Sequence, residues 1–143
     1  MESKYYTPTI NEFYVGFEYE YLSSTGWKKV IIKDSEDMCY LLFDINTDWL
    51  KDYEDIIRVK YLDKEDIESL EFICIGEANN KVEKEFQKFI NDEDNYLLET
   101  SFDNELTITF EKGFGITNDY TLFQGIIKNK SELKKLLKQL DIL

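Results

Sequence analysis

Carboxylates are the most abundant reactive side chains in this sequence, with 30 Asp and Glu residues against 17 Lys and Arg residues. Histidine is absent. This absence excludes Ser–His and Cys–His nucleophile activation, the ordinary zinc sites and a histidine pH switch. The enzyme chemistries left to consider are a carboxylate pair acting as acid and base, or a carboxylate cluster that holds Mg²⁺ or Ca²⁺.

Glu18 and Glu20 form the most suggestive carboxylate pair. They stand two residues apart in an alternating stretch, which places both side chains on one face of a strand. There they could share a cation or act as a glycosidase-like pair. The alternative is a solvated sheet face, flanked by Lys28 or Lys29 on the next strand. We favour the solvated face and predict no enzymatic activity, no catalytic residue, no metal site and no cofactor.

Other short motifs indicate structure and not chemistry. The acidic run 92–94 lacks the spaced oxygens of a calcium-binding loop, and Gly113-Phe114-Gly115 lacks the remainder of a phosphate-binding loop. Cys39 and Cys74 both stand among apolar residues, which predicts reduced cysteines in the core.

The charge is distributed unevenly along a chain whose net charge is -13. Residues 34–68 are strongly acidic, whereas lysines dominate after residue 128. An acidic surface repels phosphate, so we expect a protein partner and no direct binding of nucleic acid. Such a surface could instead occupy a basic nucleic-acid groove on another protein, or it could simply keep the domain soluble. The residues expected to form the partner surface are Asp34, Glu36, Asp37, Asp48, Asp52, Glu54, Asp55, Asp63, Glu65 and Asp66.

The length and composition predict one folded domain over residues 1–143. Aromatic residues make up 15% of the chain and hydrophobic residues 43%, which argues for a packed core. No apolar run is long enough to span a membrane, and the first residues do not resemble a signal peptide. The expectation is a cytoplasmic protein that does not contact membranes.

The hydrophobic periodicity predicts an α+β fold: a mostly antiparallel twisted sheet packed against an amphipathic C-terminal helix. Asn129 is the expected N-cap of that helix, whose leucine stripe of Leu133, Leu136, Leu137 and Leu140 should rest on the aromatic face of strand 13–22. Residues 80–91 fit either a second helix or part of a long hairpin. Thr47 and Asp48 are expected to cap a short helical turn over 49–53, and Asp63 a helix to residue 70. The other expected strands are 27–33, 38–45, 55–62, 72–75, 96–101, 105–112 and 120–127.

Three segments are similar to a group of small uncharacterised proteins of gut bacteria and their phages. They are Tyr6 to Glu20 (YTPTINEFYVGFEYE), Ile57 to Leu70 (IRVKYLDKEDIESL) and Gly125 to Leu140 (GIIKNKSELKKLLKQL). The resemblance implies a phage or mobile-element accessory protein, in the cytoplasm of a bacterial host. Our first hypothesis is therefore an accessory domain that binds a protein partner. The alternatives are an inhibitor of a host nuclease or defence complex that mimics nucleic acid, and a carboxylate-dependent metal-binding protein or hydrolase.

Overall fold

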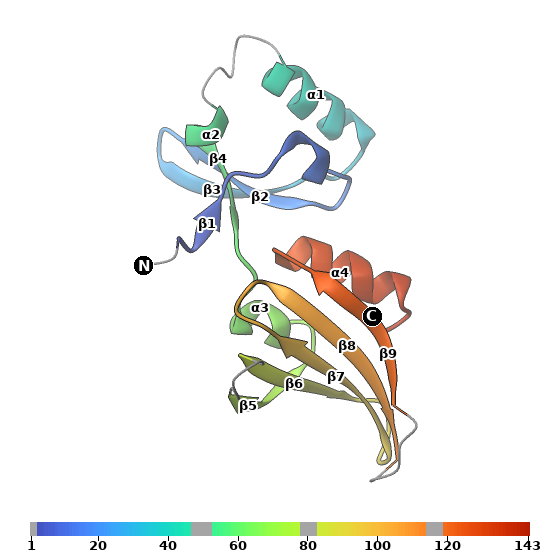
Figure 1. Cartoon of the computed structure of the whole chain (residues 1–143). Helices are drawn as coiled ribbons and strands as arrows, with labels where there is room; N and C mark the ends of the chain where they lie inside the picture. Colours follow the sequence, from blue (N-terminus) through green and yellow to red (C-terminus); the bar gives the residue numbers. More distant parts are fainter. Residues whose placement is uncertain (1–2, 47–52, 78–82, 114–118) are drawn as a thin grey trace. The chain divides into compact units, whose positions relative to one another are not determined.

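The computed structural model describes residues 3–46, 53–77, 83–113 and 119–143 (Figure 1). The chain divides into two compact units, Met1–Tyr61 and Leu62–Leu143, and each contains one antiparallel sheet. The predicted α+β class is confirmed, although the strands form two sheets and not one. The assignment of residues 1–143 to a single domain stays a prediction. Within the described residues, no helix combines the length and apolar character needed to cross a membrane.

The first unit is built on a four-stranded sheet in the order β1-β4-β2-β3. The predicted hairpin is confirmed, because β2 pairs with β3 from Glu18 opposite Ile31 to Ser23 opposite Gly26. Its elements are β1 (Tyr5–Tyr6), the 3₁₀ helix η1 (Ile10–Glu12), β2 (Glu18–Ser23), β3 (Gly26–Ile31), α1 (Ser35–Asn46), α2 (Tyr53–Ile56) and β4 (Ile57–Lys60).

The predicted first strand, 13–22, begins later than expected. Gly16 has a φ of +99°, a conformation that strands do not use, and the Phe17 N–H donates to the Tyr14 carbonyl at 2.9 Å in a turn. Phe13 and Phe17, on either side of this turn, are nevertheless buried. They pack with residues of α1 and β4 and with Ile32, which directly follows β3. The buried core of the first unit consists of Phe13, Phe17, Ile32, Leu41, Ile57 and Val59.

The strand predicted over 38–45 is wrong, because these residues lie in helix α1. Asp34 Oδ1 accepts hydrogen bonds from the Glu36 and Asp37 N–H groups, both at 2.9 Å, and so caps the start of the helix. Met38 and Leu41, three residues apart, pack in the core. Cys39 is exposed, so the prediction that it is a core cysteine is also wrong.

The segment after α1 is described only in part. Thr47 and Asp48, the predicted caps of a helical turn, lie outside the described residues. The chain is described again from Tyr53, where the short helix α2 leads into β4. In β4, Ile57 and Val59 are buried while Arg58 and Lys60 alternate with them, as the sequence predicted.

The second unit is an antiparallel meander whose strand order, β5-β6-β7-β8-β9, follows the chain. The helix capped by Asp63 and the strands predicted near residues 72, 96, 105 and 120 are confirmed. Its elements are α3 (Lys64–Glu68), β5 (Ile73–Glu77), β6 (Lys84–Phe89), β7 (Asp94–Thr100), β8 (Glu105–Lys112), β9 (Tyr120–Ile126) and α4 (Lys130–Gln139).

Residues 84–89 form a strand, so the second helix considered for residues 80–91 is wrong and the hairpin alternative is correct. Every residue of β6 pairs with β7, from Lys84 opposite Thr100 to Phe89 opposite Asn95. Phe86 is the one fully buried side chain of the strand. The apolar spacing suggested a helix because Phe86 and Phe89 stand three residues apart, but only Phe86 packs in the core.

The predicted C-terminal helix, α4, covers the sheet of the second unit. Asn129 is buried, and its Oδ1 accepts a hydrogen bond from the Glu132 N–H at 2.9 Å, which confirms the predicted cap. Leu133 and Leu137 are fully buried. They share a core with the directly paired cross-strand residues Phe86, Leu98 and Ile108. The expectation that α4 packs on the aromatic residues of 13–22 is therefore wrong, because those residues lie in the core of the first unit.

The two edges of this sheet differ. β5 is short, ends in Glu77 and contains an irregular register between Cys74 and Gly76. β9 is seven residues long and carries no charged side chain, and β8 is its only strand neighbour in the described part of the chain. Its register with β8 also shifts, between Ile108 and Thr109, which makes Leu122 an extra residue on β9. Cys74, on β5, packs partly against the core as predicted.

Candidate partner-binding surface

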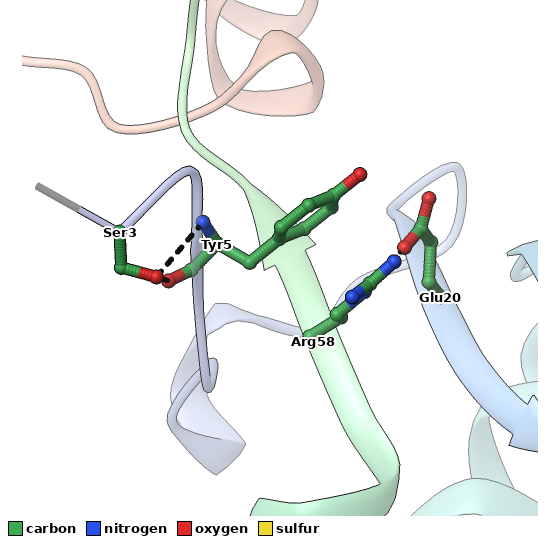
Figure 2. Close-up of polar contacts among 4 residues, drawn as sticks. All are labelled: Ser3, Tyr5, Glu20 and Arg58. Carbon is green, nitrogen blue, oxygen red and sulfur yellow. Dashed lines mark hydrogen bonds and ion pairs between the residues drawn. The ribbon is translucent and has the colours of Figure 1, made fainter. Parts of the chain in front are cut away.

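The predicted carboxylate pair, Glu18 and Glu20, lies on β2 with each carboxylate in an ion pair. Lys29 Nζ lies 2.6 Å from Glu18 Oε2. Arg58 Nε donates to Glu20 Oε2 at 2.5 Å, and Figure 2 shows these two side chains facing each other. In the described residues there is no group of three or more Cys, Asp or Glu side chains placed to hold a metal ion. The two carboxylates are thus neutralised by cations of the neighbouring strands, and their side chains, 20% and 28% exposed, are less solvated than the sequence suggested.

Arg58 is the centre of this face of the sheet. Its guanidinium carbon lies 3.7 Å from the centroid of the Tyr5 ring and 4.0 Å from that of the Trp27 ring, while its Nε binds Glu20. The positive charge therefore faces two aromatic rings and a carboxylate. We call this group, Tyr5, Glu20, Trp27 and Arg58, the Arg58 cluster. Its interactions join β1, β2, β3 and β4, which indicates a role in holding the first sheet together.

The predicted partner-surface residues divide between the two units. In the first unit, Asp34, Glu36 and Asp37 are exposed at the start of α1, and Asp55 is exposed on α2. Asp48 and Asp52 lie outside the described residues; Glu54 belongs to α2, but its side chain is not described. The remaining three residues, Asp63, Glu65 and Asp66, belong to the second unit.

Asp63 and Asp66 have a structural role that their charge alone did not indicate. The Asp66 N–H donates to Asp63 Oδ1 at 3.0 Å, and the Asp63 N–H donates to Asp66 Oδ2 at 3.4 Å. This reciprocal arrangement caps α3. Of these three residues, Glu65 is exposed, whereas Asp63 and Asp66 are partly buried. Of the predicted residues whose side chains are described, Asp34, Glu36, Asp37 and Asp55 of the first unit and Glu65 of the second are exposed.

Helix α1 presents two large aromatic side chains to solvent beside its acidic residues. Tyr40 is 63% exposed and Phe43 is 66% exposed. The Tyr40 hydroxyl donates to Glu36 Oε1 at 3.3 Å, so ring and carboxylate are neighbours. We call Glu36, Asp37, Tyr40, Phe43 and Asp44 the acidic–aromatic face of α1. Sequence reasoning missed its aromatic members because it placed them in a buried strand.

A cleft of about 430 Å³ lies between α1 and the first sheet. Its floor is apolar, because Ile32, Leu41 and Ile57 are buried. Tyrosines and charged residues form its sides, namely Tyr19, Tyr21, Lys33, Asp37, Tyr40 and Asp44. Tyr19 and Tyr21 come from the face of β2 opposite to Glu18 and Glu20, as strand alternation predicted.

The cleft has a negative electrostatic character. Burial raises the pKa of the Tyr19 phenol above its ordinary value, and the carboxylates of Asp37 and Asp44 and the phenol of Tyr21 raise it further. Asp37 is held in place, since its Oδ2 accepts a hydrogen bond from the Lys33 backbone N–H at 3.1 Å. The carboxylates therefore act on the interior of the cleft as well as on the outer surface.

The second unit contains a smaller cleft of about 150 Å³, lined by acidic and basic residues together. On the outer face of its sheet, Glu99 stands directly opposite Glu85. Burial raises the pKa of Glu99, and the carboxylates of Glu85 and Glu111 add to the effect. These features show like-charge crowding on a sheet face, on which Phe89, four residues from Glu85 along β6, is also exposed.

Comparison of the chain with protein-family models, curated proteins and solved structures found no match.

Proposed function

We propose that this chain is a non-enzymatic accessory protein that binds a protein partner through the acidic–aromatic face of α1. The observation that carries the proposal is the exposure of Tyr40 and Phe43, at 63% and 66%, beside the carboxylates of Glu36, Asp37 and Asp44. We also propose an accessory role in the cytoplasm of a bacterial host, as the expected resemblance of three segments to small proteins of gut bacteria and their phages would imply.

Aromatic residues exposed on a helix are typical of binding surfaces. Tyrosine and phenylalanine are enriched at the centre of protein interfaces, where they bury a large area at a small cost in side-chain entropy. Exposure of the apolar Phe43 ring to water is unfavourable in the free chain, and a partner that covers the ring would remove this cost. The neighbouring carboxylates would steer a basic partner toward the helix and discriminate against acidic proteins.

Affinity capture from the lysate of a bacterial host tests the proposal. The tagged full-length chain is compared with a Tyr40→Ser/Phe43→Ser variant and with Phe102→Ser, which removes a ring that is 63% exposed in the second unit. We expect the same partner to be recovered by the wild-type chain and by Phe102→Ser, and to be lost from the double variant. Equal recovery by all three proteins would exclude α1 as the binding surface.

Nucleic-acid mimicry is the second candidate function. It is favoured by the net charge of -13 and by the exposed carboxylates of Asp34, Glu36, Asp37 and Asp55 in one unit. A mimic that inhibits a host nuclease or defence complex should lose affinity steeply between 50 and 200 mM salt, as phosphate contacts do, and DNA or RNA should compete with it. Partner binding that is insensitive to salt and to nucleic acid would exclude mimicry while leaving protein binding intact.

A further inference from the structure

We infer that the cleft between α1 and the first sheet binds a basic side chain of the partner, a lysine ammonium or an arginine guanidinium on its aliphatic stem. This inference rests on the proposed function, because it names the chemical group that the partner would insert beside the acidic–aromatic face of α1.

The size and floor of the cleft suit such a side chain. Its volume of about 430 Å³ falls within the range of pockets that enclose small ligands. The buried side chains of Ile32, Leu41 and Ile57 form an apolar floor. Lysine and arginine have long aliphatic stems that pack on apolar surfaces while their charged ends remain near polar groups. The floor therefore matches the stem.

The charge of the cleft suits the cationic end. Asp37 and Asp44 stand seven residues apart on α1, which places them on the same side of the helix two turns apart. Among the described residues that line the cleft, these two carboxylates face one cation, Lys33. The raised pKa of Tyr19 is a separate sign that both carboxylates act on the interior of the cleft. An anion would be repelled there, and a neutral apolar group would gain no electrostatic attraction from the carboxylates.

Three tyrosines complete the match. Tyr19, Tyr21 and Tyr40 line the cleft, and aromatic rings attract ammonium and guanidinium groups through their electron-rich faces. The same chain already uses this interaction, since the Arg58 guanidinium lies against Tyr5 and Trp27. Carboxylates next to several aromatic rings suit an organic cation better than Ca²⁺ or Mg²⁺, which take about six or more oxygen ligands from the protein and from water.

Titration of the full-length, ¹⁵N-labelled chain followed by NMR tests this inference. The probe is Nα-acetyl-lysine methylamide. The matched neutral control is Nα-acetyl-norleucine methylamide, which has nearly the same stem without the charge. We expect the lysine probe to shift the amide signals of residues that line the cleft, with a dissociation constant on the order of 1 mM. Norleucine should bind at least about fivefold more weakly. Nα-acetyl-arginine methylamide tests whether a guanidinium is preferred to an ammonium.

Charge-neutralising variants locate the site. Asp37→Asn/Asp44→Asn should weaken binding of the lysine probe about fivefold or more and leave norleucine binding unchanged. Asp92→Asn/Asp103→Asn is the control, because it removes the same charge from exposed positions in the second unit. Asp44→Asn alone serves if the loss of the Asp37 to Lys33 hydrogen bond disturbs folding.

Three results would overturn the inference: equal binding of the lysine and norleucine probes, signal shifts outside the cleft, or an unchanged affinity in a folded cleft variant. Failure here is distinguishable from failure of the proposed function. If the chain captures a partner through α1 but does not bind the lysine probe, only the inference about the cleft is refuted. A chain that binds the probe in the cleft but captures no partner refutes only the proposed function.

Discussion

Replacing Arg58 with methionine should destabilise the first unit by about 2 kcal/mol. Methionine keeps an unbranched apolar stem and removes the guanidinium. The loss has two parts: the ring contacts with Tyr5 and Trp27, at about 0.5 to 1 kcal/mol each, and a partly buried charge pair with Glu20 at about 0.5 to 1 kcal/mol. The side chains of Arg58 and Glu20 are only 26% and 28% exposed, so solvent screens their pair incompletely.

Tryptophan fluorescence during urea unfolding measures this effect in the correct unit. The chain has two tryptophans, Trp27 and Trp49, and both belong to the first unit. With an m-value of about 1 kcal/mol per M, the expected loss lowers the unfolding midpoint by about 2 M. Far-UV circular dichroism, which reports on both units, should show a second transition that the substitution does not move.

Lys29→Met is the matched control for this experiment. It removes the neighbouring ion pair with Glu18, but the Lys29 side chain is 62% exposed and, among the described residues, contacts no ring as Arg58 does. We expect a loss of at most about 0.5 kcal/mol. If Arg58→Met and Lys29→Met shift the midpoint equally, the rings contribute nothing and the Arg58 cluster does not stabilise the sheet.

Two further predictions concern the second unit. Asn129→Ala should lower the stability of this unit by about 1 kcal/mol, because the Glu132 N–H loses its buried acceptor. Lys134→Ala, at an exposed position of the same helix, is the control and should leave the stability unchanged. Thermal unfolding followed by circular dichroism compares the two variants, and equal melting temperatures would contradict the capping role of Asn129. Glu99→Gln should raise the free energy of unfolding at pH 7, because the folded state disfavours the ionised carboxylate and so raises its pKa. This gain should disappear as the pH falls through the folded pKa to below the ordinary value of 4.5, where Glu99 is protonated in both states; a gain that persists at low pH would have another cause.

Elements with a strong local signal were predictable from the sequence. The C-terminal helix carries an N-cap at Asn129 and buried leucines at Leu133 and Leu137, so capping and periodicity indicate the same structure. The β2–β3 hairpin has alternating residues and a glycine at its turn. In both cases the local preference agrees with the final packing, which is why the prediction survives in the folded chain.

Helix α1 was predicted wrongly because its sequence, Met38 to Phe43, is a continuous apolar run. Such a run fits a buried strand as well as a helix, and periodicity cannot separate the two when apolar residues occupy every position. Two features of the sequence would have indicated the helix: Asp34, which caps its start, and the spacing of three residues between Met38 and Leu41, which both pack in the core. Tyr40 and Phe43 then remain on the solvent side.

The candidate site depends on register and packing that local sequence does not encode. The Arg58 cluster exists because β4 pairs with β2 so that Glu20 lies opposite Arg58, 38 residues away in the chain. The cleft likewise combines β2 and β4 residues with one side of α1. A single sequence gives no direct measure of such distant pairings, so the predicted acidic surface contained Asp37 but none of the tyrosines beside it.

The uncharged edge strand β9 has a consequence for how concentrated solutions of this protein behave. Unpaired backbone groups on an uncharged edge favour growth of a sheet from one copy to the next, and most proteins prevent this with charged or irregular edges. β9 has one such irregularity, at Leu122, but no charged side chain, so the remaining protection comes from the net charge of -13, which makes copies repel one another at neutral pH. Acid removes that repulsion near the isoelectric pH of about 4.4 and leaves the edge unchanged. Mild acidification should therefore cause this protein to self-associate and precipitate while its two sheets are still folded.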